Sequence, residues 1–285
     1  MKIGAVYHPE FVGRERFGDK RFSIFSGSGY DAIDYNMTNT EREIYTCSEE
    51  DFEAAMLSER ADIEAAGLFV SQVHGPWRCP PIDSTPADRV ERMEKMKRSI
   101  RAARLLGAKF WVVHPIMPNS TADLVLGGAD KTWDINIEFF TELVGYAKEM
   151  NVIICLENMP FIPFSIATPE QICRLIDAID DDNFKMCLDT GHVAVFPELS
   201  VGDCIRACGD RIRALHIHDN LGDRDSHLYP TRGRIDWNNT VSALREIGFD
   251  GVFSLEATLD ITLPDDELIA EGEKLFRIAK EIIEN

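Results

Sequence analysis

Residues 184–192 read FKMCLDTGH, a short apolar run that ends in an aspartate and is followed by a histidine. Five other runs have the same form, because each carries an imidazole or a carboxylate at or just beyond its end. They are FVSQVHG (69–75), KFWVVHP (109–115), VIICLEN (152–158), IRALHIHD (212–219) and GVFSLEA (251–257). Continuous apolar runs are typical of parallel strands that helices cover. The runs therefore predict a parallel sheet whose polar residues gather where the strands end.

Two further apolar runs, KIGAVY and DAIDYNM, bring the number of predicted strands to eight. The predicted strands are 2–7, 31–37, 69–75, 109–114, 152–158, 184–190, 212–219 and 249–256. Helical segments separate most of them, and regular strand–helix alternation indicates the α/β class with a parallel sheet. Eight such units predict closure into a (β/α)₈ TIM barrel, with residues 1–285 forming a single domain.

Three of the helical segments begin with residues that favour a helix N-terminus. Ser48 precedes the acidic helix 49–66, and Thr85 and Thr168 are each followed by a proline. The helix after Thr85 is expected to end near Leu106-Gly107 and to bury one apolar stripe. That stripe consists of Val90, Met93, Met96 and Ile100. Segments 8–30 and 115–132 have little periodicity and are expected to be loops, the first before or around a short helix.

The charge balance argues against several classes of partner. The chain has 49 acidic and 30 basic residues and a net charge of −19, which disfavours nonspecific attraction to nucleic acid or to an acidic membrane. The only basic cluster expected near the barrel mouth lies within 14–21 and is predicted to be a solvated loop; it consists of Arg14, Arg16, Lys20 and Arg21. No apolar stretch reaches 18 residues, so no membrane span is expected.

The cysteines and the first residues indicate the compartment. Seven cysteines are scattered without a CxxC pair, which suits a reducing compartment better than a disulfide framework. The chain starts MKIGAVYHPE and enters a strand directly, without the apolar core of a signal peptide. A cytoplasmic protein is therefore expected, and a homo-oligomer is left open.

Nine imidazole and carboxylate side chains lie at or just beyond predicted strand ends. They are His74, His114, Glu157, Asp189, His192, His216, Asp225, His227 and Glu256. Strand C-termini of a barrel point into one mouth, and imidazole with carboxylate is the ligand set of Zn²⁺, Mn²⁺ and related ions. A buried carboxylate is costly unless it is paired or bound to a metal. The sequence therefore predicts a divalent metal site.

Five motifs in fixed order resemble the xylose isomerase-like barrel superfamily: CLEN, CLDTGH, HIHD, DSHLYPTRGRIDW and SLEAT. The similarity runs from about residue 69 to residue 256. That superfamily joins sugar and sugar-phosphate isomerases and epimerases to zinc-dependent AP endonucleases.

The resemblance implies a ligand set. Glu157, Asp189, His216 and Glu256 match the four ligands that hold one divalent ion, Mn or Zn, in ketose 3-epimerases. Positions that match further zinc ligands of the endonucleases are His74, His114, His192, Asp225 and His227. One firmly bound ion is expected, and a count of up to three is left open. His218 is expected to line the pocket.

The favoured activity is an isomerase or epimerase of a small sugar, polyol or sugar phosphate. Glu157 and Glu256 would exchange a proton with the substrate through a metal-stabilised enediolate. The substrate-binding candidates are His192, His218, Arg224, Arg234 and Trp77. Because such barrels often bind phosphate after strand seven, the arginines at 224, 232 and 234 leave a phosphorylated substrate open.

Two departures from the family pattern concern the substrate. The position that matches the substrate arginine of the ketose epimerases holds Gly222, with Arg224 two residues on. A GxG sequence is usual before IDW, and its first glycine is replaced by Thr231. Two alternatives stay open, a zinc phosphodiesterase of the AP-endonuclease type and a metal-dependent lyase or dehydratase. The acidic or neutral loops argue against DNA as substrate.

Overall fold

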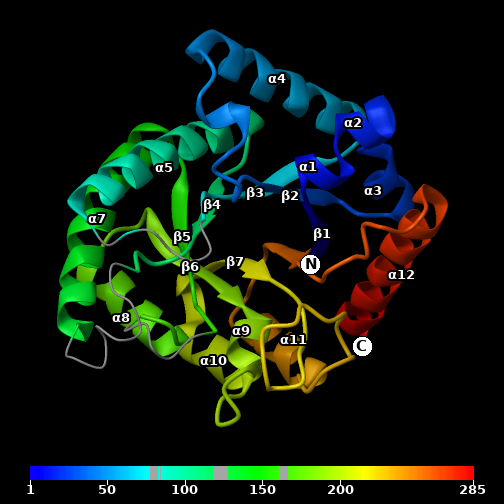
Figure 1. Cartoon of the computed structure of the whole chain (residues 1–285). Coiled ribbons are helices and arrows are strands. Elements are labelled where there is room, and N and C mark those ends of the chain that lie inside the picture. The colour runs from blue at the N-terminus through cyan, green and yellow to red at the C-terminus, as the bar shows by residue number, and fades with distance from the viewer. Residues whose placement is uncertain (78–82, 84, 118–127, 161–165) are drawn as a thin grey trace.

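The structure is a computed structural model that describes residues 1–77, 83, 85–117, 128–160 and 166–285. Eight parallel strands lie in the order β7-β6-β5-β4-β3-β2-β1-β8, inside a ring of helices (Figure 1). They are β1 (Lys2–Tyr7), β2 (Ala32–Asn36), β3 (Phe69–His74), β4 (Phe110–Val113), β5 (Ile153–Glu157), β6 (Phe184–Asp189), β7 (Ile212–His216) and β8 (Val252–Leu255).

Backbone contacts between β7 and β8 close the sheet. A parallel bridge joins Ile217 to Leu255. The Ile217 N–H donates to the Ser254 carbonyl at 2.8 Å, and the Glu256 N–H donates to the Ile217 carbonyl at 3.0 Å. The predicted (β/α)₈ barrel is thereby confirmed.

Short and long helices surround the strands. They are α1 (Pro9–Val12), α2 (Arg14–Phe17), α3 (Ser23–Ser28), α4 (Glu49–Ala65), α5 (Pro86–Leu106), α7 (Ala129–Glu149), α8 (Pro169–Ile179), α9 (Thr190–Ala194), α10 (Val201–Cys208), α11 (Trp237–Glu246) and α12 (Asp265–Glu284). The predicted N-caps are confirmed, because the hydroxyls of Ser48, Thr85 and Thr168 each accept from a backbone N–H of the first turn. Gly107 ends α5 with a φ of +79°, where glycine is favoured.

One residue of the predicted α5 stripe is wrong. Met93, Met96 and Ile100 are buried, whereas Val90 is 65% exposed. At about 100° per residue, Val90 lies about 120° round the helix from Met96, near the centre of the buried face. It therefore points away from the barrel.

Two predicted loops and two strand ends also differ. Segment 8–30 contains α1, α2 and α3 instead of one short helix. Most of the predicted loop 115–132 lies outside the described residues, and α7 begins within it. β7 ends at His216, since the chain turns so that Asp219 pairs antiparallel with Leu228. β8 begins at Val252 rather than 249, because the Phe249 N–H bonds the Leu244 carbonyl at the end of α11.

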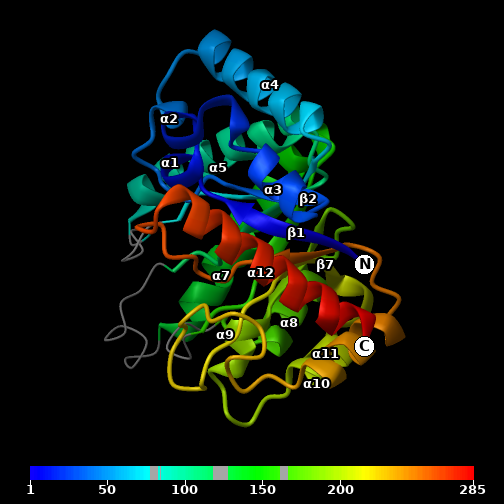
Figure 2. The ribbon, with the colours of Figure 1, turned by 90° about the vertical axis from the view of Figure 1, so that its right-hand side faces the viewer.

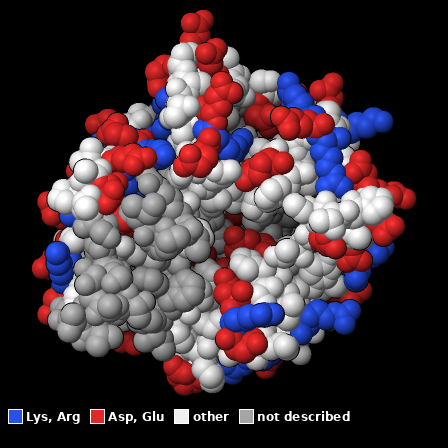
Figure 3. Space-filling view, in the orientation of Figure 1, with Lys and Arg blue, Asp and Glu red and all other residues white. Residues whose placement is uncertain are grey.

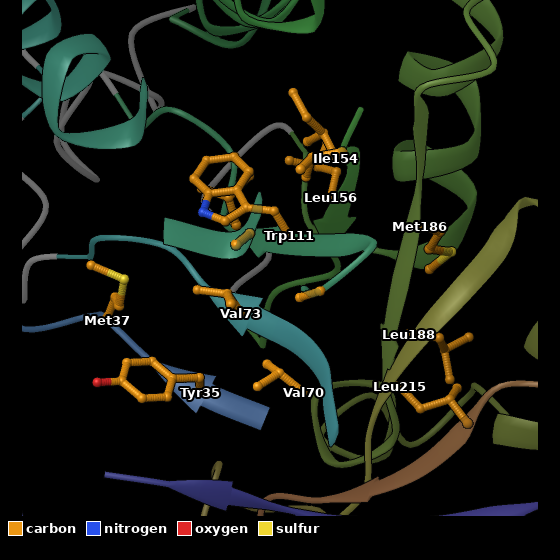
Figure 4. Packing of buried hydrophobic residues seen from close by; sticks show 14 of the residues in the cluster. Tyr35, Met37, Val70, Val73, Trp111, Ile154, Leu156, Met186, Leu188 and Leu215 are labelled. Atoms are coloured by element: carbon orange, nitrogen blue, oxygen red, sulfur yellow. The ribbon is translucent and has the colours of Figure 1, made fainter. Parts of the chain in front are cut away.

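A continuous apolar core packs against the strands. Figure 4 shows side chains from β2 to β7 in this core, among them Val73, Trp111 and Leu188. The fully buried Trp111 indole donates to Ser99 Oγ of α5 at 2.9 Å. Figure 2 shows α12 lying along the outside of β1, and α12 packs on β1 and α3. Among the described helices, none has both the length and the apolar character that crossing a bilayer requires.

Candidate metal centre

Four of the predicted ligands meet at one end of the barrel. Glu157, Asp189 and His216 are the last residues of β5, β6 and β7, and Glu256 follows β8 directly. The parallel ladder sets Asp189 beside His216, so β6 and β7 end level, and it sets Glu157 beside Cys187, two residues before the end of β6. Figure 3 shows the molecule hollowed near its centre, with acidic side chains inside the hollow.

These four residues form what we call the core cluster. His216 Nδ1 lies 3.1 Å from Glu157 Oε1, 3.3 Å from Glu256 Oε2 and 3.9 Å from Asp189 Oδ2. Ligand atoms about 2.1 Å from a tetrahedral ion are about 3.4 Å apart. Within the described part of the chain, the buried atoms His216 Nδ1 and Glu157 Oε2 have no hydrogen-bond partner. The core cluster therefore fits one divalent ion.

A carboxylate that the sequence analysis missed positions His216. Asp34, in the middle of β2, is fully buried, and its Oδ2 lies 3.1 Å from His216 Nε2. Gln72 Nε2 donates to the same oxygen at 2.7 Å. Such a carboxylate fixes the imidazole tautomer, so that Nδ1 is the nitrogen left for a metal. The signal was an acid in the middle of a predicted buried strand, which is costly unless the acid has a partner.

The other oxygen of Glu157 faces two histidines. Glu157 Oε2 lies 3.4 Å from His74 Nε2 and 3.2 Å from His114 Nε2. His74 also stacks on His216, with the ring centroids 5.3 Å apart. Glu157 therefore lies between His216 on one side and this imidazole pair, His74 and His114, on the other.

A second group of predicted residues lies beside the core cluster. We call it the loop cluster: His192, His218, Asp225 and His227. Asp225 Oδ2 lies 3.2 Å from both His192 Nε2 and His227 Nε2. The Nδ1 atoms of these two histidines are 2.7 Å and 2.9 Å from the carbonyls of Asn158 and Glu256. Each ring thus uses its Nδ1–H on a carbonyl and presents Nε2 to Asp225.

His218 links the two clusters. It is fully buried, its Nε2 lies 2.9 Å from Asp189 Oδ2, and its ring stacks on His227 with centroids 3.9 Å apart. A Cβ on Gly191 would lie 2.0 Å from the His218 ring, so only glycine fits there. This explains the glycine of the DTGH motif.

The surroundings drive the pKa values of the two glutamates apart. Burial would raise the pKa of Glu157, but His216 and His114 outweigh it and hold that pKa well below its usual range. Burial raises the pKa of Glu256, against the opposing effect of His216 and His227. Two carboxylates with opposite shifts suit the roles of base and acid.

The pKa values of the histidines are also shifted in opposite directions. Burial lowers the pKa of His114 to about 4. Burial acts against the charged form of His192 and His227 too, but the Asp189 and Asp225 carboxylates raise the pKa of His192 to about 10, and chiefly Asp225 raises that of His227 to about 9. The loop cluster without an ion is therefore held together by charged histidines around an ionised Asp225.

The predicted substrate-binding residues outside the clusters lie in different settings. Trp77 packs edge-on against His114 at a centroid distance of 5.1 Å, and its buried indole Nε1 has no acceptor in the described ranges. Arg224 is exposed on the loop after β7. Arg234 donates to the carbonyls of Ala194 at 3.1 Å and Pro197 at 3.0 Å, so the structure does not bring it to the clusters. The substrate roles of all three stay predictions.

The loop that carries Asp225 is held by Asp219. Both oxygens of this fully buried carboxylate accept hydrogen bonds, among them those from the Thr231 N–H at 3.2 Å and Trp237 Nε1 at 3.0 Å. Thr231, which replaces the expected glycine, has a φ of +74°, a conformation that a β-branched residue rarely adopts. The departure from the family pattern thus leaves the backbone in the form that a glycine would favour.

The three arginines of the predicted basic cluster are paired with carboxylates, whereas Lys20 is exposed. Arg21 is fully buried and lies 2.6 Å from Asp62 and 3.0 Å from Glu59 of α4. Arg14 shares Asp62 at 2.6 Å, and Arg16 pairs with Asp265 at 2.9 Å. The prediction of a solvated loop was therefore wrong for Arg21, whose charge serves packing between the N-terminal segment and α4.

Comparison with known proteins agrees with this architecture. The xylose isomerase-like TIM barrel family matches residues 23–278. An uncharacterized protein of Methanocaldococcus jannaschii is 33% identical over 193 residues, which cover 65% of this chain and 63% of that protein. The D-psicose 3-epimerase of Enterocloster bolteae is 25% identical over 267 residues, covering 90% and 82% of the two chains. A crystal structure of D-psicose 3-epimerase with D-tagatose, from Clostridium cellulolyticum, superposes with a TM-score of 0.79 at 19% identity and 99% coverage of both chains. The chain belongs to the xylose isomerase-like TIM barrel family.

Proposed function

We propose that this member of the xylose isomerase-like TIM barrel family is a metal-dependent isomerase or epimerase of a small carbohydrate. The observation that carries the proposal is the core cluster, in which Glu157 and Glu256 both approach His216 Nδ1 from strands three positions apart around the barrel. Their carboxylates can therefore reach a bound sugar from different sides. The relative named as a 3-epimerase, which aligns over most of both chains, supports the same activity.

The core cluster would hold the ion, Zn²⁺ or Mn²⁺, through Glu157, Asp189, His216 and Glu256. A divalent ion bound there polarises the carbonyl and hydroxyl oxygens of a sugar and so acidifies the C–H beside the carbonyl. Asp34 keeps His216 in the tautomer that leaves Nδ1 free. The imidazole pair and the loop cluster line the same mouth and can bind substrate hydroxyls or further ions.

Glu157 and Glu256 move the proton. The low pKa of Glu157 keeps it ionised, so it can remove the proton from the carbon beside the carbonyl. Glu256, whose pKa is raised by burial, would return a proton to the enediolate. Return to the opposite face inverts that carbon, and return to the neighbouring carbon moves the carbonyl. In the reverse direction the two residues exchange roles.

Two further contacts bear on the substrate. The unpartnered indole N–H of Trp77 can donate to a sugar hydroxyl, in keeping with its predicted role. Arg234 already binds backbone carbonyls, which leaves the exposed Arg224 and Arg232 as the guanidinium groups after β7 that could meet a phosphate. A phosphorylated sugar would therefore depend on these two residues.

Isotope exchange tests the proposal. Metal-replete protein incubated with a panel of ketoses in deuterated water should place deuterium on a carbon next to the carbonyl, since a carboxylate open to solvent exchanges its proton before returning it. Mass spectrometry and NMR of the recovered sugar locate the label. Absence of label from every ketose would count against proton transfer.

A zinc phosphodiesterase is the second candidate, and one observation favours it. Glu157 lies between His216 and the imidazole pair, and Asp225 lies between His192 and His227, so the mouth offers donors for up to three ions. Against it, Arg16 and Arg21 of the basic cluster expected near the mouth are paired with carboxylates. Two to three ions per chain by elemental analysis, together with nicking of abasic DNA and no isotope uptake, would establish this candidate instead.

A further inference from the structure

An apolar cavity of about 390 Å³ opens beside the core cluster. It lies between the strands β1 and β8 on one side and the helices α1, α3 and α12 on the other. Hydrocarbon side chains make up most of its wall, among them Phe11, Ile24, Phe25, Leu259, Leu268 and Leu275. Protein interiors contain few voids larger than a water molecule, so a cavity of this size is not ordinary packing.

The polar end of the cavity is the metal centre itself. Glu256 of the core cluster and His227 of the loop cluster both line it. Two hydroxyl groups of the wall already have acceptors: Ser28 donates to the Ile24 carbonyl at 2.8 Å and Tyr30 to the Gly272 carbonyl at 2.9 Å. The other polar side chains of the wall are His8 and Thr258. A sugar hydroxyl placed among the hydrocarbon side chains would lose its hydrogen bonds to water without replacement, which is unfavourable.

The rim is apolar too. Phe11 and Ile261 line the cavity and are 44% and 38% exposed. A ligand that reaches from the metal centre into the cavity would cover them. The volume falls within the usual range of small-molecule pockets.

From this continuity we infer that the substrate is a carbohydrate that carries a hydrocarbon substituent of about aromatic size. Its polyhydroxy part lies at the core cluster, and its apolar part fills the cavity. The inference rests on the proposed function and narrows its substrate class. A sugar whose anomeric carbon bears such a group cannot open to its free carbonyl form, so the reacting carbonyl would be a ketone on the ring.

Gly272 gives a way to fill the cavity without harming the fold. It is buried in α12 and lines the cavity, and a Cβ built on it meets no atom within 4 Å. Leucine there would enter the open space and also favours the helix more than glycine does. Gly145, exposed on α7 with equally open surroundings, provides the matched control.

The experiment compares the phenyl and methyl glycosides of one ring-keto hexose by deuterium exchange in metal-replete protein. We expect wild-type protein to favour the phenyl compound in kcat/KM by about tenfold or more, since a buried ring is removed from water. G272L should reduce that preference by about tenfold, and G145L should leave it unchanged. Equal rates for the two glycosides, or an unchanged preference in G272L, would overturn the inference while the proposed function stands.

Binding of the unreactive phenyl glucoside, measured by calorimetry, separates the two claims. Weaker binding to G272L than to G145L, with no isotope exchange in any sugar, would keep the apolar subsite and remove the proposed function. Equal binding to both variants would remove the subsite.

Discussion

The core cluster and the loop cluster use the same side-chain types but are built in different ways. Glu157, Asp189 and His216 end strands, and their side chains are at most 1% exposed. Asp225 and His227 lie on a loop, and their side chains are 22% and 29% exposed. His227 also has a φ of +45°, outside the range of regular strands and helices.

The difference lies in what fixes each ligand. Strand pairing fixes the position of each strand-end residue relative to the residues that end the adjacent strands. The loop is held by hydrogen bonds to Asp219, and His227 on it is positioned by the Glu256 carbonyl. His192, on α9, is positioned by the Asn158 carbonyl. We therefore expect the core cluster to hold an ion more tightly than the loop cluster does.

The largest expected effect is on catalysis in the core cluster. Glu256→Gln should lower the rate of deuterium exchange by about 10³-fold or more, because it removes both a ligand and a proton carrier. Circular dichroism should show an intact barrel. The matched control is Glu198→Gln, at an exposed position, which should keep full activity. An active Glu256→Gln protein would refute the assignment.

A smaller loss, in ion affinity, is expected when Asp34, which positions His216, is changed. Asp34→Asn should weaken ion affinity by about 10- to 100-fold, since a neutral amide holds the His216 tautomer less firmly. Ion affinity is measured by competition with a chromogenic chelator. Restored exchange at high metal concentration would show that Asp34 acts through the ion, whereas unchanged affinity would mean that Asp34 serves packing alone.

Replacing a carboxylate of the loop cluster by its amide should lower the rate of proton transfer less than Glu256→Gln does. Asp225→Asn removes the carboxylate shared by His192 and His227, so any additional ion should be lost in elemental analysis. Exchange into the ketose should fall by less than about tenfold if the core ion alone drives proton transfer. Loss comparable to that of Glu256→Gln would erase the distinction between the clusters and favour multinuclear chemistry.

The smallest effect concerns pH and the metal-free protein. The folded-state pKa values of His192 and His227, about 10 and about 9, exceed the ordinary value of 6.5. Their contribution to folding is therefore complete below about pH 6.5 and is lost as the pH rises through 9 to 10. Chemical unfolding of metal-free protein should show the free energy of unfolding declining over this interval. Asp225→Asn should flatten that decline, and an identical pH profile would contradict the role of Asp225.

The fold and the core cluster could be predicted from the sequence because both depend on strand ends. An apolar run marks each strand, and the acid or histidine that follows it, such as Asp189 after FKMCL, must lie at the mouth. Asp34 was not predicted because it lies inside a strand, and its role depends on His216 across the barrel.

The loop residues show the limit of the same reasoning. The types at Asp225 and His227 were recognised by resemblance, but their meeting depends on the turn held by Asp219, which no periodicity encodes. The ion pair of the buried Arg21 with the partly exposed Asp62 joins segments 41 residues apart, and the sequence gives no sign of which acid a given arginine will meet. The carbonyl acceptors of Arg234 were likewise not predictable from the sequence, and its substrate role stays a prediction.

The seam between β7 and β8 has a mechanical consequence. Two backbone hydrogen bonds on Ile217 join these strands, and His216 and Glu256 lie immediately beside that seam. An ion held by both side chains would cross-link β7 and β8 where the barrel closes. Ion binding and stabilisation of the barrel closure would then be coupled, because the same two residues take part in both.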